Sequence, residues 1–429
     1  MLSLFKNRNF SFYWISHFIS VVGDHVTFLA FPWLVLQMTG SVAMTGLVLA
    51  AQGIPRAIFM LWGGALVDRT SPRATIMVTN LVRMVLMAIL TYAIIQNTAT
   101  LTIIFSVALI FGLADAFYYP ASNAIIPSIL KKGTRQKGNA IIQMTTHLSI
   151  IFGPVIAGFL IAGEINTHSA GHTPDISGLS DYEQDRSGLA RAFMFDAFSF
   201  ALSCVALLLV KTRSLKTETQ ERASTSMWEE VKEAIHFCWS IPAMRLTFIS
   251  ITILEFFYQA PIFVGLPALA KARFAEGAFV YGLEIAAYGL GAFLGSIAGG
   301  IVKPHHPRKM ILYMLLLFAW SSATLGLIVI WEPYEWAMLL FFTAGAGDSY
   351  IWVHVITWVQ EVTPERLLGR VMSIFMFMSV GLLPVGNMIM GFLFEWNLEV
   401  ALIGASIFMT IACLLLTLHP DRKVITPQE

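Results

Sequence analysis

Two apolar stretches, each long enough to cross a bilayer, are joined by the charged segment Gly63-Gly64-Ala65-Leu66-Val67-Asp68-Arg69-Thr70-Ser71-Pro72-Arg73. The pattern predicts a helix that leaves the membrane near Asp68 and Arg69, turns at Ser71-Pro72 and re-enters. An acid and a base are costly in hydrocarbon, so this turn must lie at the membrane surface. Basic loop residues favour the cytoplasmic side, so Arg69 and Arg73 predict that the surface is cytoplasmic.

The chain as a whole is strongly apolar. Of its 429 residues, 57% are hydrophobic and 12% are charged, and the formal net charge is +1. Soluble proteins carry about 25% charged residues, whereas runs of about 20 apolar residues recur throughout this chain. We therefore predict an all-α polytopic membrane protein. Cys204, Cys238 and Cys413 are isolated and lack the spacing of a metal or redox site, so no metal and no cofactor is expected.

Twelve transmembrane helices are predicted, in two six-helix bundles. They cover residues 10–38, 42–67, 73–96, 100–129, 138–163, 190–211, 244–269, 278–302, 308–331, 334–361, 367–394 and 398–419. The predicted division is 1–211 for the N-terminal bundle, 212–242 for a cytoplasmic linker and 243–429 for the C-terminal bundle. In the linker, Trp228, Val231, Ile235 and Cys238 have helical spacing, which predicts an amphipathic helix on the membrane surface.

Basic residues predict the orientation. With the N-terminus inside, 20 of the 27 Lys and Arg residues fall on the cytoplasmic side, four fall outside and three lie in or at the ends of spans. This bias predicts that both termini are cytoplasmic in the inner (plasma) membrane. No small-residue cleavage site follows the first span, which is therefore expected to be retained.

The two halves of the chain resemble each other. Gly63-Gly64 followed by Pro72-Arg73 recurs as Gly299-Gly300 followed by Pro307-Arg308. Weak symmetry between two six-span halves is typical of secondary transporters. No phosphate-binding loop is found, so energy should come from an ion gradient, with the proton gradient as the expected source, or from the substrate's own gradient.

The motifs resemble those of the major facilitator superfamily. The segment Gly64-x-Leu66-Val67-Asp68-Arg69-x-Ser71-x-Arg73 is similar to its signature G-x-L-a-D-R-x-G-R-[KR], with Ser71 and Pro72 as departures. Similarity to the drug:proton antiporter branch, which includes macrolide efflux and siderophore export proteins, rests on these further motifs: Gly23-Asp24, Pro32-Trp33-Leu34, Pro120-Ala121, Ile126-Pro127, Gly153-Pro154-x-x-Ala157-Gly158, Phe195-Asp196-Ala197-x-Ser199-Phe200 and Gly369-Arg370-Val371-Met372-Ser373.

This resemblance implies the major facilitator fold, two pseudo-symmetric six-helix bundles around a central cavity. It also implies gating roles for Gly64, Asp68, Arg69, Arg73, Gly153, Pro154 and Arg370, with Asp68 closing a cytoplasmic latch against Arg370 and the start of the eleventh span. One departure is in the fourth span: many members have an arginine near the position of Phe111, and this chain has none there.

Four acids provide the sharpest signal that comes from the residues themselves. Asp24, Asp115, Glu255 and Asp348 each fall near the middle of a span, in the first, fourth, seventh and tenth spans. Charges at this depth cost about 3 kcal/mol or more and normally face a polar interior or a partner. We expect the set to bind protons, a cationic substrate or both in turn, with Arg56 as the counter-ion of Asp24 or Asp115. The alternative is a purely structural ion pair.

Polar and aromatic neighbours share faces with these acids. Tyr118 and Tyr119 accompany Asp115, Tyr258 and Gln259 accompany Glu255, Trp352 accompanies Asp348, and Gln143 and His147 are one turn apart in the fifth span. Such a lining suits amphipathic organic cations, although ordinary helix packing explains each aromatic equally well. His25 and His354 are further candidates for proton transfer, with simple packing as the alternative.

Three other charged groups are assigned to gating or helix capping, with a structural role favoured: Asp196, Glu284 and the off-centre Arg83. The loop 164–188 contains two histidines and several acids, but its composition favours a solvated loop over a metal site.

The resulting prediction is a proton-coupled exporter of small drug- or macrolide-like molecules that works by alternating access. The alternatives are a siderophore exporter and an importer or uniporter of the same fold. An enzyme is not expected because no nucleophile or metal cluster is found, and midplane acids argue against a receptor or scaffold. The expected partners are a small-molecule substrate and the lipid bilayer, without nucleic acid, and the protein is expected to be monomeric.

Overall fold

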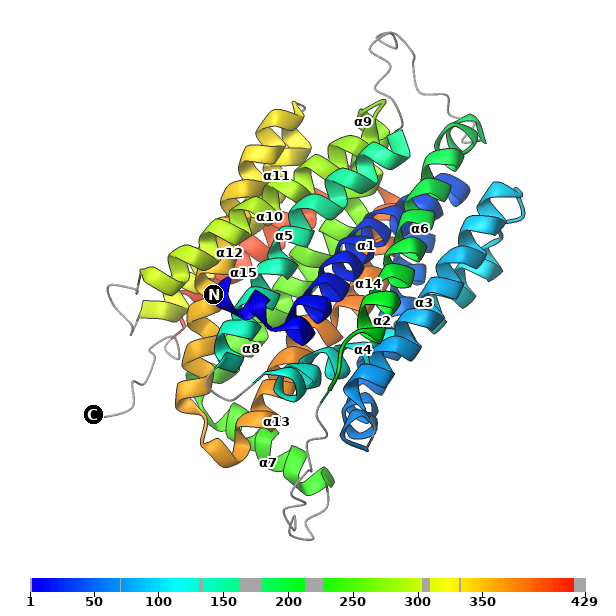
Figure 1. Ribbon diagram of the computed structural model, residues 1–429. Coiled ribbons are helices and arrows are strands. Elements are labelled where there is room, and N and C mark those ends of the chain that lie inside the picture. Colours follow the sequence, from blue (N-terminus) through cyan, green and yellow to red (C-terminus); the bar gives the residue numbers. More distant parts are fainter. Residues whose placement is uncertain are drawn as a thin grey trace. The chain divides into compact units, whose positions relative to one another are not determined.

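The computed structural model describes residues 2–69, 71–130, 134–162, 179–212, 227–302, 309–331 and 333–419 (Figure 1). Within these residues, twelve helical segments are long and apolar enough to cross a membrane. Each overlaps one of the twelve predicted spans, with ends that differ by at most seven residues. The all-α fold class is therefore confirmed.

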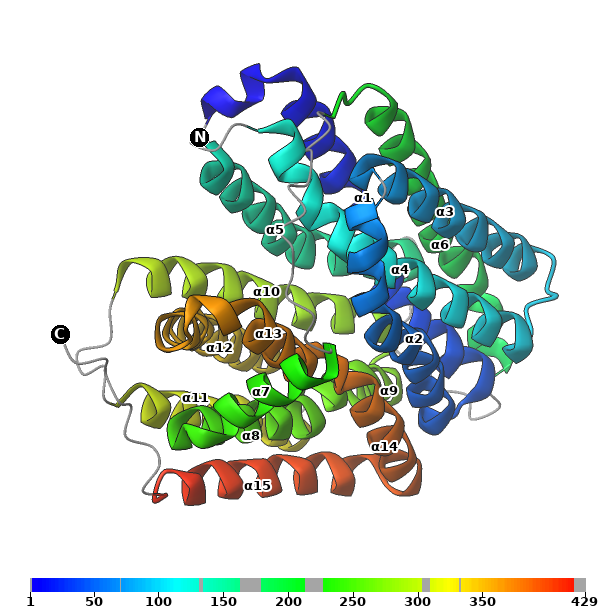
Figure 2. The ribbon, with the colours of Figure 1, turned by 90° about the horizontal axis from the view of Figure 1, so that it is seen from below.

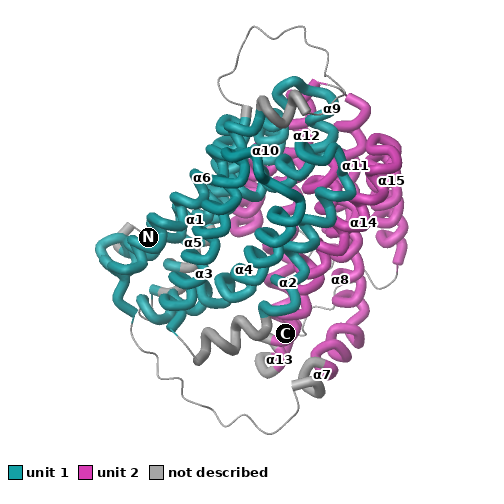
Figure 3. The backbone as a smooth tube through the Cα atoms, turned by 90° about the vertical axis from the view of Figure 1, so that its right-hand side faces the viewer, with its two compact units in different colours: residues 1–217, 266–286 teal, residues 218–265, 287–429 magenta. Residues whose placement is uncertain are grey.

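The chain falls into two compact units, coloured separately in Figure 3. Unit 1 comprises residues 1–217 and 266–286, and unit 2 comprises residues 218–265 and 287–429. Residues 266–286, which the predicted division assigns to the second bundle, thus group with unit 1. The division into two six-helix bundles at 1–211 and 243–429 stays a prediction.

Unit 1 is built from the first six spans and the segment 266–286. Its helices are α1 (Arg8–Thr39), α2 (Val42–Arg69), α3 (Pro72–Ile95), α4 (Leu101–Ile129), α5 (Arg135–Ala162), α6 (Leu179–Leu208), α9 (Leu266–Arg273) and the beginning of α10 (Gly277–Ile301). The helix α6 packs along both α1 and α3, and α2 packs along α4 (Figure 2). This arrangement brings polar side chains from α1, α3, α4 and α6 into one interior.

Local sequence sets the helix ends of unit 1. Asn7 caps α1 by accepting hydrogen bonds from the N–H groups of Asn9 and Phe10. Gly40 ends the helix with φ of 65°, a left-handed conformation that glycine adopts without strain. The predicted turn after Asp68 is present: α2 ends at Arg69 and α3 begins at Pro72, whose fixed φ suits a first helical position.

Unit 2 contains the remaining helices. They are α7 (Met227–Ser240), α8 (Pro242–Leu254), the rest of α10, α11 (Met310–Ile330), α12 (Tyr334–Val362), α13 (Glu365–Met376), α14 (Leu383–Trp396) and α15 (Leu398–Leu416). The seventh span is a composite in which the π-helical segments Glu255–Gln259 and Pro261–Gly265 separate α8 from α9. A π-helical turn is rare and is often found at functional sites, and this one begins at a midplane acid.

The helix predicted in the linker is present as α7. Ala234 and Cys238 are buried, whereas Ile235 is 46% exposed and Trp239 is 49% exposed. That the helix lies on the membrane surface stays a prediction. Residues 235 and 239 are one turn apart and form a second apolar strip, which a bilayer surface could cover.

Candidate functional site

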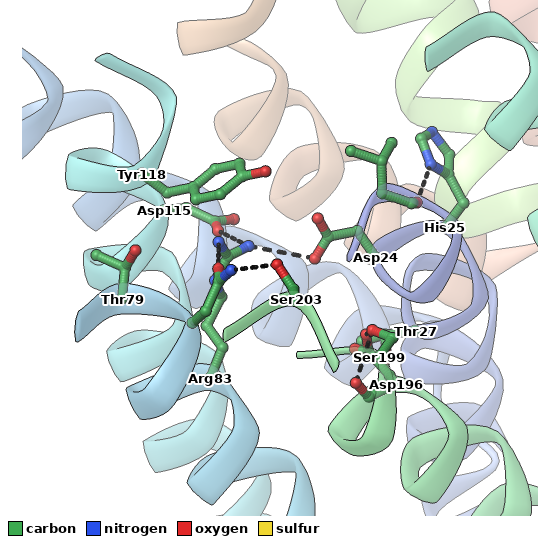
Figure 4. A network of polar contacts seen from close by, with 12 residues as sticks. Asp24, His25, Thr27, Thr79, Arg83, Asp115, Tyr118, Asp196, Ser199 and Ser203 are labelled. Carbon is green, nitrogen blue, oxygen red and sulfur yellow. Dashed lines mark hydrogen bonds and ion pairs between the residues drawn. The ribbon is translucent and has the colours of Figure 1, made fainter. Parts of the chain in front are cut away.

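A buried arginine organises the polar interior of unit 1. The Nη1 atom of Arg83 on α3 donates to Oδ1 of Asp24 on α1 and to Oδ1 of Asp115 on α4, each at 3.2 Å (Figure 4). Its Nη2 atom donates to Oδ1 of Asn80 at 2.7 Å. Asn80 in turn donates to Ser203 on α6 at 2.8 Å. One guanidinium therefore links three helices directly and a fourth through Asn80.

The burial of this cation is extensive. The Arg83 side chain is 1% exposed, and its guanidinium lies 3.9 Å from the ring centre of Tyr118 and 4.7 Å from that of Phe200. A desolvated guanidinium over aromatic faces gains about 2 kcal/mol from each favourable stacking contact. The cation also lies 5.7 Å from the Phe111 ring. Arg83 of α3 thus places a positive charge beside Phe111 of α4, near which α4 itself has no arginine.

The two carboxylates differ in their access to solvent. The Asp115 side chain is 5% exposed, but that of Asp24 is 25% exposed. Asp24 is therefore the member of the ion-paired group that water or a ligand can reach.

The expected counter-ion was wrong. Arg83, and not Arg56, makes the ion pairs with Asp24 and Asp115, and Arg56 acts on Asp115 only from beyond ion-pair distance. Arg56 on α2 lies over the ring of Tyr119, 6.0 Å from its centre, and Tyr119 is 43% exposed. The placement of Arg83 away from the centre of its span was also wrong, whereas a role in gating stays a prediction. The 24-residue helix α3 begins at Pro72, so Arg83 stands at its middle. Counting residues from Pro72 would have given this position from the sequence.

Unit 2 holds its own pair of buried acids. Asp348 on α12 accepts a hydrogen bond from Ser321 on α11 at 2.7 Å and from Tyr288 on α10 at 3.3 Å. Glu255 is 5% exposed and is close enough to Asp348 for the two carboxyl groups to interact electrostatically. Among the described residues, neither acid has a basic partner within ion-pair distance. Ser321 and Tyr288 are functional candidates that sequence reasoning missed.

The other predicted residues of unit 2 lie around this pair in different ways. Tyr258 is fully buried, and its hydroxyl has no hydrogen-bond partner within the described part of the chain. Gln259 lies near the Tyr288 hydroxyl. Trp352 packs on Phe375, with ring centres 5.1 Å apart, and no contact with Asp348 is seen.

The predicted residues of α5 and α1 are placed as follows. The Nδ1 atom of His147 is buried without a hydrogen-bond partner in the described structure. The Gln143 side chain lies outside the described residues. Nδ1 of His25 is 2.8 Å from the carbonyl oxygen of Val21, one turn away. A Cβ atom on Gly153 would overlap that of His25, so this glycine permits close approach of α5 and α1.

Of the predicted gating residues, Arg73 and Pro154 have defined surroundings. Arg73 donates to the carbonyl oxygens of Leu207 at 2.8 Å and Leu208 at 3.0 Å. It therefore caps the end of α6, where a cation stabilises the helix. The carbonyl of Pro154 would be 2.5 Å from a Cβ at Gly282, so α5 and the start of α10 also approach closely.

The latch remains a prediction. The backbone of Gly64, Asp68 and Arg69 is helical, but their side chains lie outside the described residues. Arg370 is 3.8 Å from Glu233 of α7, with both side chains partly exposed.

Comparison with known proteins places the chain in a family. A family model described as Major Facilitator Superfamily matches residues 13–383. The multidrug efflux pump Tap of Mycolicibacterium fortuitum is 22% identical over 378 residues, which cover 86% of this chain and 85% of Tap. The enterobactin exporter EntS of Salmonella paratyphi A is 24% identical over 399 residues, which cover 91% of this chain and 87% of EntS.

Solved structures agree on the fold. The nucleoside transporter NupG aligns with a TM-score of 0.71 at 13% identity, covering 95% of this chain and 99% of NupG. A D-xylose–proton symporter aligns with a TM-score of 0.64 at 14% identity, covering 93% of this chain and 96% of the symporter. The chain therefore belongs to the major facilitator superfamily and is a multi-pass membrane transporter.

Proposed function

We propose that this transporter is a proton-coupled exporter of small amphipathic organic molecules, located in the inner (plasma) membrane with both termini in the cytoplasm. The observation that carries the proposal is the Arg83 network. Asp24 contacts a buried guanidinium and is itself 25% exposed. A carboxylate in that position can exchange its partner between Arg83, a proton and a cationic substrate.

The geometry connects this exchange to helix movement. When Asp24 binds a proton or a substrate cation, its attraction to Arg83 weakens. Arg83 keeps its contacts with Asp115 and Asn80, so α1 is released relative to α3 and α4. A ligand shifts a conformational equilibrium only through such a difference in contacts between two states. Protonation would therefore favour one facing state of the alternating-access cycle.

Glu255 and Asp348 extend the proposal to unit 2. They are two neighbouring buried acids with no basic partner among the described residues, and Asp348 accepts hydrogen bonds from two hydroxyl groups. Ionised acids in this setting attract a cation, and protons or an organic cation would serve equally. The exposed aromatic ring of Tyr119 in unit 1 adds a surface on which a cationic ring could stack.

The similarity to Tap supports export of drug-like molecules. A siderophore exporter is the second candidate, and the similarity to EntS over 91% of the chain favours it. An importer or uniporter remains the alternative with respect to direction, since proteins of both directions share this fold.

The test is ethidium accumulation in cells that express the protein, with and without a proton uncoupler. We expect wild-type cells to retain less ethidium than cells without the protein, and the uncoupler to remove the difference. The variants Asp24→Asn and Asp115→Asn should accumulate ethidium as cells without the protein do. Glu335→Gln is the matched control, because this acid is exposed in the first turn of α12.

Direction is tested in membrane vesicles of opposite orientation. Accumulation of ethidium in inside-out vesicles upon acidification of their lumen supports an exporter. Accumulation in right-side-out vesicles instead, or efflux that is unchanged in both aspartate variants, would contradict the proposal. Replacing ethidium by a catechol siderophore in the same vesicles distinguishes the two candidate substrates.

A further inference from the structure

Unit 1 contains a further carboxyl group close to the Arg83 network, Asp196 on α6. It is 0% exposed. Thr27 on α1 donates to its Oδ2 atom at 2.5 Å, and Ser199, one turn along α6, donates to its Oδ1 atom at 3.1 Å. Figure 4 shows these three side chains together, beside Asp24. Both hydrogen-bond partners are neutral hydroxyl groups.

The backbone of α1 leaves room for this carboxyl group. A Cβ atom at Gly23 would overlap Oδ1 of Asp196 and Oγ of Ser199. Gly23 directly precedes Asp24, so the same turn of α1 admits Asp196 and presents Asp24. The missing side chain at position 23 is thus part of how the two acids come close together.

The charges of this interior do not balance. The charged groups that act on Asp196 are Asp24 from α1, Arg83 from α3 and Asp115 from α4. Among the described residues, three ionised carboxylates and Arg83 would carry a net charge of −2, and Arg56, which acts on Asp115 from beyond ion-pair distance, would reduce it to −1. The helix α5 also packs on α6, and His147 is the titratable side chain described on it. Unpaired buried charge is expensive, so at least one of the carboxyl groups should hold a proton.

We propose that Asp196 is a proton-binding site that exchanges its proton with Asp24. Asp24 and Asp115 each have the guanidinium at ion-pair distance, whereas the side-chain partners of Asp196 within the described residues are hydroxyl groups. A hydroxyl group can donate to a carboxylate and can also accept from a carboxylic acid, so this site suits both protonation states. Asp24, which is partly exposed, takes a proton from water and passes it to the Asp196 carboxylate. The acid form of Asp196 returns it by the same route.

The proposal deepens the proposed proton coupling and rests on it for its role in transport. The proton site itself is testable without a substrate. Infrared spectroscopy of the purified full-length protein at neutral pH reports the C=O stretch of protonated carboxyl groups. We expect Asp196→Asn to lose one carboxylic-acid band that the wild type and Glu335→Gln both have. Identical spectra for wild type and Asp196→Asn would overturn the proposal.

A second variant covers the case in which Asp196→Asn does not fold. Thr27→Val keeps the shape of residue 27 but removes the hydroxyl group that contacts Oδ2. The band of Asp196 should move to higher frequency in Thr27→Val and stay in place in Thr27→Ser. A band unmoved by Thr27→Val would count against Asp196 as its source.

The two proposals can fail separately. Loss of the infrared band in Asp196→Asn supports the proton site whether or not ethidium is transported. A wild type whose ethidium efflux ignores the uncoupler would contradict proton coupling and leave the band assignment standing. If efflux is proton-dependent in the wild type and unaltered in its proton dependence by Asp196→Asn, exchange with Asp24 during transport is excluded.

Discussion

At the scale of single residues, Arg83 is the side chain on which the interior of unit 1 depends. We expect Arg83→Gln to destabilise the protein by about 3–5 kcal/mol, since removing one partner leaves buried carboxylates without compensation. Thermal unfolding of the purified protein in detergent measures this loss. The double variant Arg83→Gln with Asp115→Asn should recover part of it, because one of the uncompensated charges is gone.

Arg56→Gln is the matched control for that prediction. Arg56 is also an arginine within a span, but its guanidinium stacks at 6.0 Å on the partly exposed ring of Tyr119. Its loss should cost about 0.5–1 kcal/mol, the value of an exposed cation–π contact. Equal destabilisation by the two variants would show that Arg83 is not the principal cation of the network.

At the scale of helices, the glycines of α10 determine how closely it approaches α12. A Cβ at Gly295 would overlap the carbonyl oxygen of Ala346, whereas nothing lies within 4 Å of a Cβ at Gly300. We expect Gly295→Ala to lower stability by about 1–3 kcal/mol through overpacking. Gly300→Ala in the same helix should be neutral or stabilise by up to about 1 kcal/mol, because alanine favours the helix. Melting temperatures that fall equally in both variants would contradict a close contact at residue 295.

The same scale shows what sequence could and could not predict. Twelve spans follow from apolar length, which a bilayer imposes on every helix that crosses it. The π-helical segment that begins at Glu255 was not predicted, because its extra residue per turn leaves no mark in a hydropathy pattern. The partners of Asp348 were missed for another reason. Ser321 and Tyr288 come from other helices, and which faces meet is decided by packing between helices.

The sequence predicted how far along their spans the acids of the candidate site lie, but not which arginine pairs with them. Counting along spans located Asp24 and Asp115 in the bilayer interior. The same count favoured Arg56 as their counter-ion, and this choice failed because a position along a helix does not give the direction in which the side chain points. Arg83 reaches both acids because its side chain extends from the middle of α3 to Asp24 on α1 and Asp115 on α4, which only the tertiary structure decides.

At the scale of the whole molecule, the proposed orientation predicts which loops impermeant reagents reach in intact cells. Ser71, between α2 and α3, and Gln96, between α3 and α4, are both exposed and lie at opposite ends of α3. With the basic loops inside, a membrane-impermeant maleimide should label Gln96→Cys and should label Ser71→Cys only after cells are opened.

The native cysteines should add little background to that experiment. Cys238, on the linker helix, is 1% exposed, and burial raises the pKa of its thiol to about 11. Maleimides react with thiolates, so this protonated thiol reacts slowly at neutral pH. The wild-type protein, which keeps all three cysteines, measures the remaining background. Labelling of Ser71→Cys in intact cells, with Gln96→Cys protected, would invert the topology and with it the direction assigned to export.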